Sequence, residues 1–155
     1  MVWIYAQFWG MARSDLLEAT LTRSVIGAFF EVYNNLGYGF LEHLYVMALE
    51  RELLARGHRV AREVWARVVY KGEQLGIQRI DMIVDEKVVI ETKASSKLPD
   101  YAARQLFNYL RATNLEVGIL LHFGPKASFH REICRNTRRN PPNPFNPPNP
   151  NNPPS

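Results

Sequence analysis

The sequence predicts an α+β (mixed α/β) domain in which helices flank a central β-sheet. Two stretches with apolar residues at helical spacing come first, four strand-like stretches follow, and a third helical stretch precedes two more strands. This order is typical of a sheet whose apolar faces are covered by helices. A chain of 155 residues, of which 46% are apolar, is long enough to bury the core of one such domain.

Glycine and proline mark the ends of the three predicted helices. Gly37 ends the first helix and Gly57 the second, and Pro99 suits the first turn of the third, where a backbone N–H group has no helical partner in any case. The expected helices cover residues 15–36, 40–56 and 100–113. The expected strands cover residues 58–64 and 66–70, a hairpin that turns at residues 85–87, a buried run at 116–122 and an edge strand at 128–133.

The predicted hairpin carries the most informative residues of the chain. Alternate residues of a strand share a face, so Glu91 and Lys93 project to the same side. If the hairpin is symmetric about Glu86, Asp81 lies opposite Glu91 with Cβ atoms about 4.5–5.5 Å apart, where like charges destabilise a sheet. Hard cations such as Mg²⁺ bind through one or two carboxylates together with water and phosphate oxygens. The pattern D-x9-E-x-K therefore predicts a metal-dependent phosphodiesterase, with an ordinary solvated strand face as the alternative.

Residues of two predicted helices are candidates for the same site. Glu42 heads an apolar stripe of the second helix, which points its carboxylate at the protein, where burial without a partner is costly. The alternative is a glutamate that only compensates the helix dipole. Gln105 and Tyr109 lie one turn apart on the third helix and could hydrogen-bond a carboxylate, lysine or phosphate. The alternative there is an ordinary amphipathic helix.

Three segments occur together, in order and at familiar spacing. Gly39, Glu42 and Tyr45 form a G-x-x-E-x-x-Y signature within LGYGFLEHLYVMAL, which is followed by VVYKGEQLGIQRIDMIVDEKVVIETKA and QLFNYLRATNLEVGILLHFG. With these motifs, residues 21–133 resemble the GxxExxY family, a branch of the PD-(D/E)xK nuclease superfamily. The chain departs from the family pattern at His122, where an asparagine is usual.

The resemblance implies a restriction-endonuclease-like core, with a mixed sheet, helices on both sides and a metal site on the hairpin. Residue by residue, Asp81 and Glu91 match the acidic metal ligands, Lys93 the motif lysine, Glu42 the helical glutamate of related exonuclease branches, and Gln105 with Tyr109 their Q-x-x-x-Y element.

The expected activity is hydrolysis of phosphodiester bonds of DNA or RNA with Mg²⁺ or Mn²⁺. We expect Asp81, Glu91 and the carbonyl of Thr92 to hold the cation, with Glu42 binding it directly or through water. Lys93 is expected to orient the attacking water or to neutralise the scissile phosphate. The candidate substrate contacts are Arg79, Gln105 and Tyr109, and the symmetric hairpin register would place Arg79 opposite Lys93.

Composition and the chain ends bound the remaining expectations. The net charge of +4 suits an anionic partner, and the single cysteine, Cys134, excludes an internal disulfide and fits a reducing, cytoplasmic compartment. We expect an N-terminal extension at residues 1–14, with Met11 as an alternative start, a nuclease-like domain at 15–136 and a disordered Asn/Pro-rich tail at 137–155. The apolar run MVWIYAQFWG is too short to span a bilayer, so no membrane is expected.

Three classes of function are compatible with the sequence. The first is the metal-dependent nuclease, acting on nucleic acid with DNA favoured over RNA. The second is a catalytically inactive nucleic-acid-binding or accessory protein of the same fold. The third is an interaction protein that acts through the Asn/Pro tail. A homodimer is left open in each case.

Overall fold

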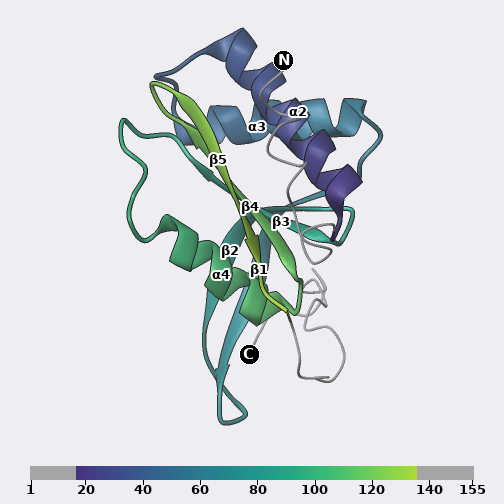
Figure 1. Cartoon of the computed structure of the whole chain (residues 1–155). Coiled ribbons are helices and arrows are strands. Elements are labelled where there is room, and N and C mark those ends of the chain that lie inside the picture. Colours follow the sequence, from purple (N-terminus) through teal and green to yellow (C-terminus); the bar gives the residue numbers. More distant parts are fainter. Residues whose placement is uncertain (1–16, 136–155) are drawn as a thin grey trace, which may run out of the picture.

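The computed structural model describes residues 17–135 and confirms the predicted fold class (Figure 1). Within these residues three helices and five strands follow one another. The elements are α2 (Ala19–Leu36), α3 (Glu42–Ala55), β1 (Val60–Tyr70), β2 (Glu73–Val84), β3 (Val88–Lys93), α4 (Ala102–Thr113), β4 (Val117–Phe123) and β5 (Ala127–Ile133). The expected extension at residues 1–14 and the expected tail at 137–155 lie outside the described residues.

The strands form a mixed sheet in the spatial order β1-β2-β3-β4-β5. All neighbours are antiparallel except β3 and β4, which are parallel. Parallel neighbours need a crossover connection, and α4 supplies it. β5 lies at an edge of the sheet, as its sequence predicts.

Helices cover both faces of this sheet (Figure 1). On one face α2 and α3 bury a core that includes Phe29, Tyr45 and Phe123. On the other face α4 buries a second core around Leu106 and Leu110. Because β3 and β4 have apolar cover on both sides, their sequences read as nearly continuous apolar runs. No helix in residues 17–135 is long and apolar enough to cross a membrane.

β1 corrects the sequence prediction, because the two strands expected at residues 58–64 and 66–70 are a single strand, which begins only at Val60. Its backbone is irregular at two points: Glu63 has a φ of 52°, and the pairing register shifts between Val68 and Val69. A non-glycine residue with positive φ is uncommon in a strand and changes its course.

In both β1 and β2, the alternation of side chains between the two faces of the sheet is interrupted at the same level. On β2, Ile80 belongs to the core under α4 and Met82 to the core under α2 and α3, although strict alternation would put both on one face. Their partners on β1 behave alike: Val64 packs with the α4 core, whereas Arg62 hydrogen-bonds to α3. Asp81 therefore lies at the position of β2 where the alternation shifts from one face of the sheet to the other.

A hydrogen-bonded chain of three side chains fastens the β2–β3 turn to α2. Nδ1 of His58 donates to Asp85 Oδ2 at 2.8 Å, and Nε2 lies 2.7 Å from Ser24 Oγ. The other oxygen of Asp85 accepts from the backbone N–H of Arg59 at 2.8 Å. Ser24 lies in the second turn of α2, where the backbone N–H groups are used by the helix and cannot form an oxyanion hole. We therefore interpret this Ser–His–Asp chain as a clamp that fixes the turn.

Close packing of α4 on β4 gives a stability test. A Cβ added at Gly118 would lie 2.7 Å from Cδ1 and 2.9 Å from Cγ of Leu106, a buried side chain with little room to move. We expect Gly118→Ala to lower the free energy of unfolding by about 1–3 kcal/mol, measured by denaturant titration. The matched control is Gly76→Ala, where a Cβ meets nothing within 4 Å. Equal losses in the two variants would contradict this packing.

Candidate active site

The candidate site lies where β2 and β3 stop pairing. The paired residues are Met82 with Ile90, Ile83 with Val89 and Val84 with Val88, which confirms the hairpin register predicted from symmetry about Glu86. In that register Asp81 falls opposite Glu91, just beyond the last pair. The two carboxylates therefore lie at the open end of the hairpin, where the strands separate.

Two carboxylates bind the backbone edge that β3 presents after it leaves β2. The N–H of Thr92 donates to Oδ2 of Asp81 at 2.8 Å, and the N–H of Ala94 donates to Oε2 of Glu42 at 3.0 Å. Amide groups two residues apart in a strand point to the same edge, so these two carboxylates take the places that a neighbouring strand would fill. Asp81 from β2 and Glu42 from α3 are thus fixed next to each other along β3.

Glu91 and Lys93 form a buried ion pair on β3. Nζ of Lys93 donates to Oε1 of Glu91 at 2.7 Å, and the two side chains are only 14% and 4% exposed. The second oxygen of Glu91, Oε2, is buried without a hydrogen-bond partner among the described residues. Burial, reinforced by the nearby charge of Asp81, raises the pKa of Glu91 to about 7. Although burial by itself lowers the pKa of Lys93, the bond to Glu91 outweighs it, and that pKa is raised.

Repulsion between carboxylates reaches beyond Glu91. Burial raises the pKa of Asp81, the N–H of Thr92 opposes that rise, and the charge of Glu42 adds to it. The charge of Glu42 also contributes to the raised pKa of Glu91. Three carboxylates therefore share one region of negative potential, which a cation would relieve.

The exposure of Glu42 corrects one sequence expectation. Glu42 is the first residue of α3 and is exposed, so its carboxylate is not buried against the protein as the apolar stripe suggested. The buried part of the stripe begins one turn later, at Tyr45. Because the first turn of α3 reaches past the packed region, Glu42 meets solvent and the end of β3 together.

The remaining residues of the G-x-x-E-x-x-Y signature hold the turn before α3. Oη of Tyr45 donates to the carbonyl of Gly37 at 2.7 Å and accepts from the N–H of Phe40 at 3.1 Å. Its ring stacks on Phe123, with centroids 4.2 Å apart and planes 18° from parallel. Gly37 and Gly39 have φ values of 70° and 111°, which glycine adopts without strain. The tyrosine and the glycines therefore determine where the signature glutamate emerges.

Gln105 and Tyr109 of α4 face the site from the other side of the sheet. Nε2 of Gln105 donates to Oη of Tyr109 at 2.6 Å, and Oε1 of Gln105 is buried without a partner among the described residues. Burial, followed by the charge of Glu91, raises the pKa of Tyr109. The two residues lie one helical turn apart, as predicted, but the hydrogen bond between them was not predicted, and the phenol lies within the electrostatic influence of Glu91.

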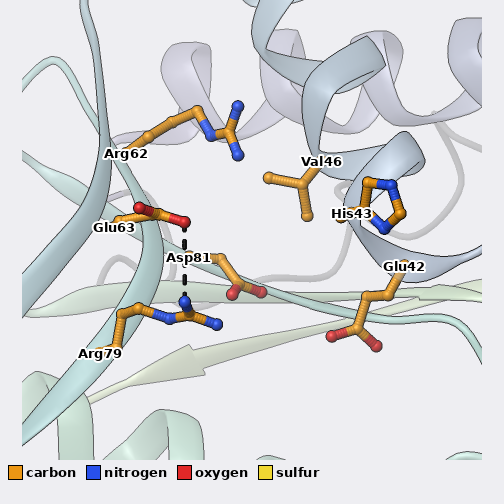
Figure 2. A pocket seen from close by; sticks show the side chains of 7 residues that line it. All are labelled: Glu42, His43, Val46, Arg62, Glu63, Arg79 and Asp81. Atoms are coloured by element: carbon orange, nitrogen blue, oxygen red, sulfur yellow. Dashed lines mark ion pairs between the residues drawn. The ribbon is translucent and has the colours of Figure 1, made fainter.

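The side chain of Arg79 lines a pocket between α3 and the two strands β1 and β2 (Figure 2). Nη1 of Arg79 lies 3.6 Å from Oε1 of Glu63. The expected position opposite Lys93 is wrong, because the β2–β3 pairing ends at Met82 and Ile90. Arg79 lies beyond that point and is paired only on its other side, with Trp65 of β1. The pocket is lined by Glu42, His43, Val46, Arg62, Glu63, Arg79 and Asp81.

Four polar residues near the site were not assigned a role from the sequence. His43, Arg62 and Glu63 line the pocket, and only the bend of β1 brings the last two there. His122 pairs with Lys93 across β3 and β4, and its Nε2–H donates to the carbonyl of Ser95 at 2.8 Å. His122 therefore fixes the segment that follows the motif lysine. In the sequence, the only indication of a role for His122 was that it stands where the family usually has an asparagine.

The donor set fits a hard divalent cation, although the ligands are not gathered as in a closed metal site. Across residues 17–135, no group of three His, Cys, Asp or Glu side chains is arranged to hold a metal ion. The unpartnered oxygen of Glu91 and the mutual repulsion of Asp81, Glu91 and Glu42 are nevertheless the features that a cation would satisfy. The residues suited to hold it are these three, all of them oxygen donors.

The raised pKa of Glu91 predicts a pH-dependent stability. The folded chain binds the proton of Glu91 more tightly than an unfolded chain with a pKa near 4.5, so stability falls as pH rises from 4.5 to about 7. Glu91→Gln removes this loss. In the presence of a chelator, we expect the melting temperature of Glu91→Gln to rise relative to that of the wild type as the pH increases from 4.5 to about 7. Above pH 7 the difference in free energy of unfolding should reach up to about 3 kcal/mol in favour of the variant. Glu31→Gln, on the exposed side of α2, should follow the wild type; a pH-independent difference for Glu91→Gln would contradict the raised pKa.

Comparison with known proteins assigns the family. Residues 19–136 match the family model of the PD-(D/E)XK nuclease superfamily. No curated protein sequence matches the chain. The crystal structure of SSO0001 is similar at 22% identity and a TM-score of 0.49, over 78% of this chain and 61% of that one. An alkaline exonuclease, LHK-Exo from Laribacter hongkongensis, is similar at 11% identity and a TM-score of 0.46, over 84% of this chain and 80% of its own. Since the family model matches most of its length, this chain belongs to the PD-(D/E)XK nuclease superfamily.

Proposed function

We propose that the chain is a metal-dependent nuclease that hydrolyses phosphodiester bonds at the open end of the β2–β3 hairpin. The observation that carries the proposal is the convergence of Asp81, Glu91 and Glu42 beside the partly buried ammonium of Lys93. Like charges gathered at a partly buried position destabilise a protein, so their presence there is best explained by function. Membership of a nuclease superfamily supports the same conclusion.

The proposed cofactor is Mg²⁺ or Mn²⁺, held by Asp81 and Glu91, by the carbonyl of Thr92, and by Glu42 directly or through water. When bound, such a cation activates water and neutralises charge on the phosphate. Asp81 and Glu42 are already oriented by backbone N–H groups of β3, so their free oxygens need little reorganisation. Glu91 must lose its proton to bind, which makes cation binding stronger above a pH of about 7.

Lys93 is proposed to act on the substrate phosphate or on the attacking water. Its pKa is raised, so the ammonium keeps its proton at neutral pH. The ammonium donates one N–H group to Glu91 and has further N–H groups to donate to a phosphate oxygen. If Glu91 held a cation, the ammonium of Lys93 would be free to donate to a phosphate oxygen of the substrate.

Arg79, Gln105 and Tyr109 are proposed substrate contacts on the two sides of the site. Arg79 reaches the pocket beside Asp81, and its ion pair with Glu63 is more than half exposed, so that a phosphate can replace it at little cost. The unpartnered Oε1 of Gln105 offers an acceptor to substrate or water. DNA is favoured over RNA as the substrate, and a homodimer remains part of the proposal without an assigned surface.

We further infer that the chain belongs to the GxxExxY branch of the superfamily. Each residue of the signature has a separate part, which supports the inference: Gly39 and Tyr45 shape the turn before α3, and Glu42 extends from it to the end of β3.

The direct test is cleavage of labelled single- and double-stranded DNA and RNA with Mg²⁺ or Mn²⁺. We expect the wild type to cut at least one substrate, and chelation to abolish cutting. Asp81→Ala, Glu91→Ala and Lys93→Ala should each lose more than about 100-fold, because even indirect partners of a metal ligand cost 10–100-fold. Glu31→Ala should be unchanged, because within residues 17–135 the Glu31 carboxylate accepts a hydrogen bond from Asn35 of the same exposed helix face and from no site residue. A folded wild type that binds nucleic acid but cuts nothing would favour the accessory protein instead.

The exposed position of Glu42 makes a separate prediction for Glu42→Gln. The amide oxygen can still accept from the N–H of Ala94, so the geometry survives while the charge is lost. We expect activity to fall by about 10–100-fold and to recover partly at higher cation concentration. A cation titration of the cleavage rate measures this. Unchanged cation dependence would exclude Glu42 from the cation site.

A further inference from the structure

The hairpin of β1 and β2 continues past the helices as an arm, defined here as residues 64–80, whose base is packed under α4 at Ala66 and Ile80 (Figure 1). Its base lies beside the candidate site and its tip extends into solvent. Large apolar side chains are unusually exposed along it, and Trp65 near the base is 47% exposed. Its other exposed apolar residues are Val69, Tyr70, Leu75 and Ile77.

Trp65 lies on the side of the arm that faces the pocket. Its neighbours along β1, Val64 and Ala66, pack with the α4 core, so its own side chain points the other way. Directly across the ladder, Trp65 pairs with Arg79. Arg79 in turn lines the pocket together with Asp81, as Figure 2 shows. An exposed indole ring therefore lies one ladder position from a proposed phosphate contact.

Cations accompany the ring along the same face. Arg67 lies two residues beyond Trp65, is exposed, and pairs across the ladder with Ile77. The ion pair of Arg79 with Glu63 is exposed on both partners, at 56% and 60%. Surface pairs of this kind contribute little and exchange readily for another anion. An aromatic platform between two guanidinium groups has the chemistry of a nucleotide contact, with a base on the ring and phosphates on either side.

We propose that Trp65, flanked by Arg67 and Arg79, is a stacking platform for an unpaired base, so that the arm binds single-stranded nucleic acid next to the active site. This inference rests on the proposed nuclease function and specifies its substrate class. In a duplex the faces of the bases are covered by their neighbours, whereas a single strand can turn a base onto an exposed ring. The platform selects strandedness and not sequence, because every base offers a stacking face.

Charge favours this occupant over a second copy of the chain. A twofold interface built on this face would bring the arginines of one copy toward those of the other. Like charges opposed across an interface are unfavourable, whereas a phosphate backbone is complementary to them. The face is also continuous with the pocket at Asp81, where the proposed function places a phosphodiester.

The test is binding of the full chain to short labelled oligonucleotides in a chelator, followed by fluorescence anisotropy. Four probes are used: single-stranded DNA, single-stranded RNA, blunt duplex DNA, and single-stranded DNA with abasic central positions. We expect Trp65→Ala to weaken binding of intact single strands about tenfold, the value of roughly one stacked base. Trp65→Phe, which keeps a ring, should recover most of that loss. Leu54→Ala is the matched control, since Leu54 is similarly exposed, at 52%, on α3.

The abasic probe separates stacking from any general effect of the substitution. It keeps the phosphates but has no base to stack, so the wild type and Trp65→Ala should bind it equally. Duplex binding should differ by less than about twofold between the two proteins. Equal affinity of both for the intact single strand overturns the proposal, as does a loss of the same size on duplex or abasic probes. Sedimentation that shows a wild-type dimer and a Trp65→Ala monomer also overturns it and assigns the arm to a second copy.

The outcomes remain separate from those of the cleavage test. A chain that cuts nucleic acid with Trp65→Ala and wild type equally fast and binds with equal affinity is a nuclease without this platform. A chain that binds single strands through Trp65 and cuts nothing in Mg²⁺ or Mn²⁺ has the platform without the catalysis.

Discussion

The buried ion pair between Glu91 and Lys93 is the interaction around which the site is arranged. A carboxylate removed from water needs a partner, and Lys93 provides one for a single oxygen only. The nearby charges of Asp81 and Glu42 make the ionised form of Glu91 still harder to maintain. The fold tolerates this because β3 lies in the middle of the sheet, paired with β2 before the site and with β4 along its whole length. The paired backbone of β3 therefore keeps these like charges close together, whereas on a mobile loop the carboxylates would move apart.

The separation of β2 from β3 turns this central strand into a binding edge. Where β2 departs, the amide groups of Thr92 and Ala94 would be left without a strand partner, and carboxylates from two elements accept from them instead. The same departure opens the hairpin and frees the continuation of β2 to form the arm with β1. One change of direction in the sheet therefore creates both the acidic cluster and the projecting surface beside it.

The hairpin and its acidic residues could be predicted because they depend on local rules. The symmetry about Glu86 follows from the length of two apolar runs and one short polar turn, and alternation then fixes the partners of Asp81 and Glu91. The helix ends at Gly37 and the one-turn spacing of Gln105 and Tyr109 follow equally from short-range geometry. The bend at Glu63 could not be predicted in this way. A positive φ in a strand has no sequence signal of its own when the residue is a glutamate.

By itself, the sequence determined the order of the elements apart from the division of β1, the hairpin register and the residues that carry charge near its open end. Tertiary structure alone decided which groups meet there. It left Glu42 exposed, because only the later turns of α3 pack on the sheet. It paired Arg79 with Trp65 instead of Lys93, because β2 leaves β3 and stays with β1. Local periodicity fixes the face of a strand on which a side chain lies, whereas the point at which two strands separate is set by packing with elements distant in the chain.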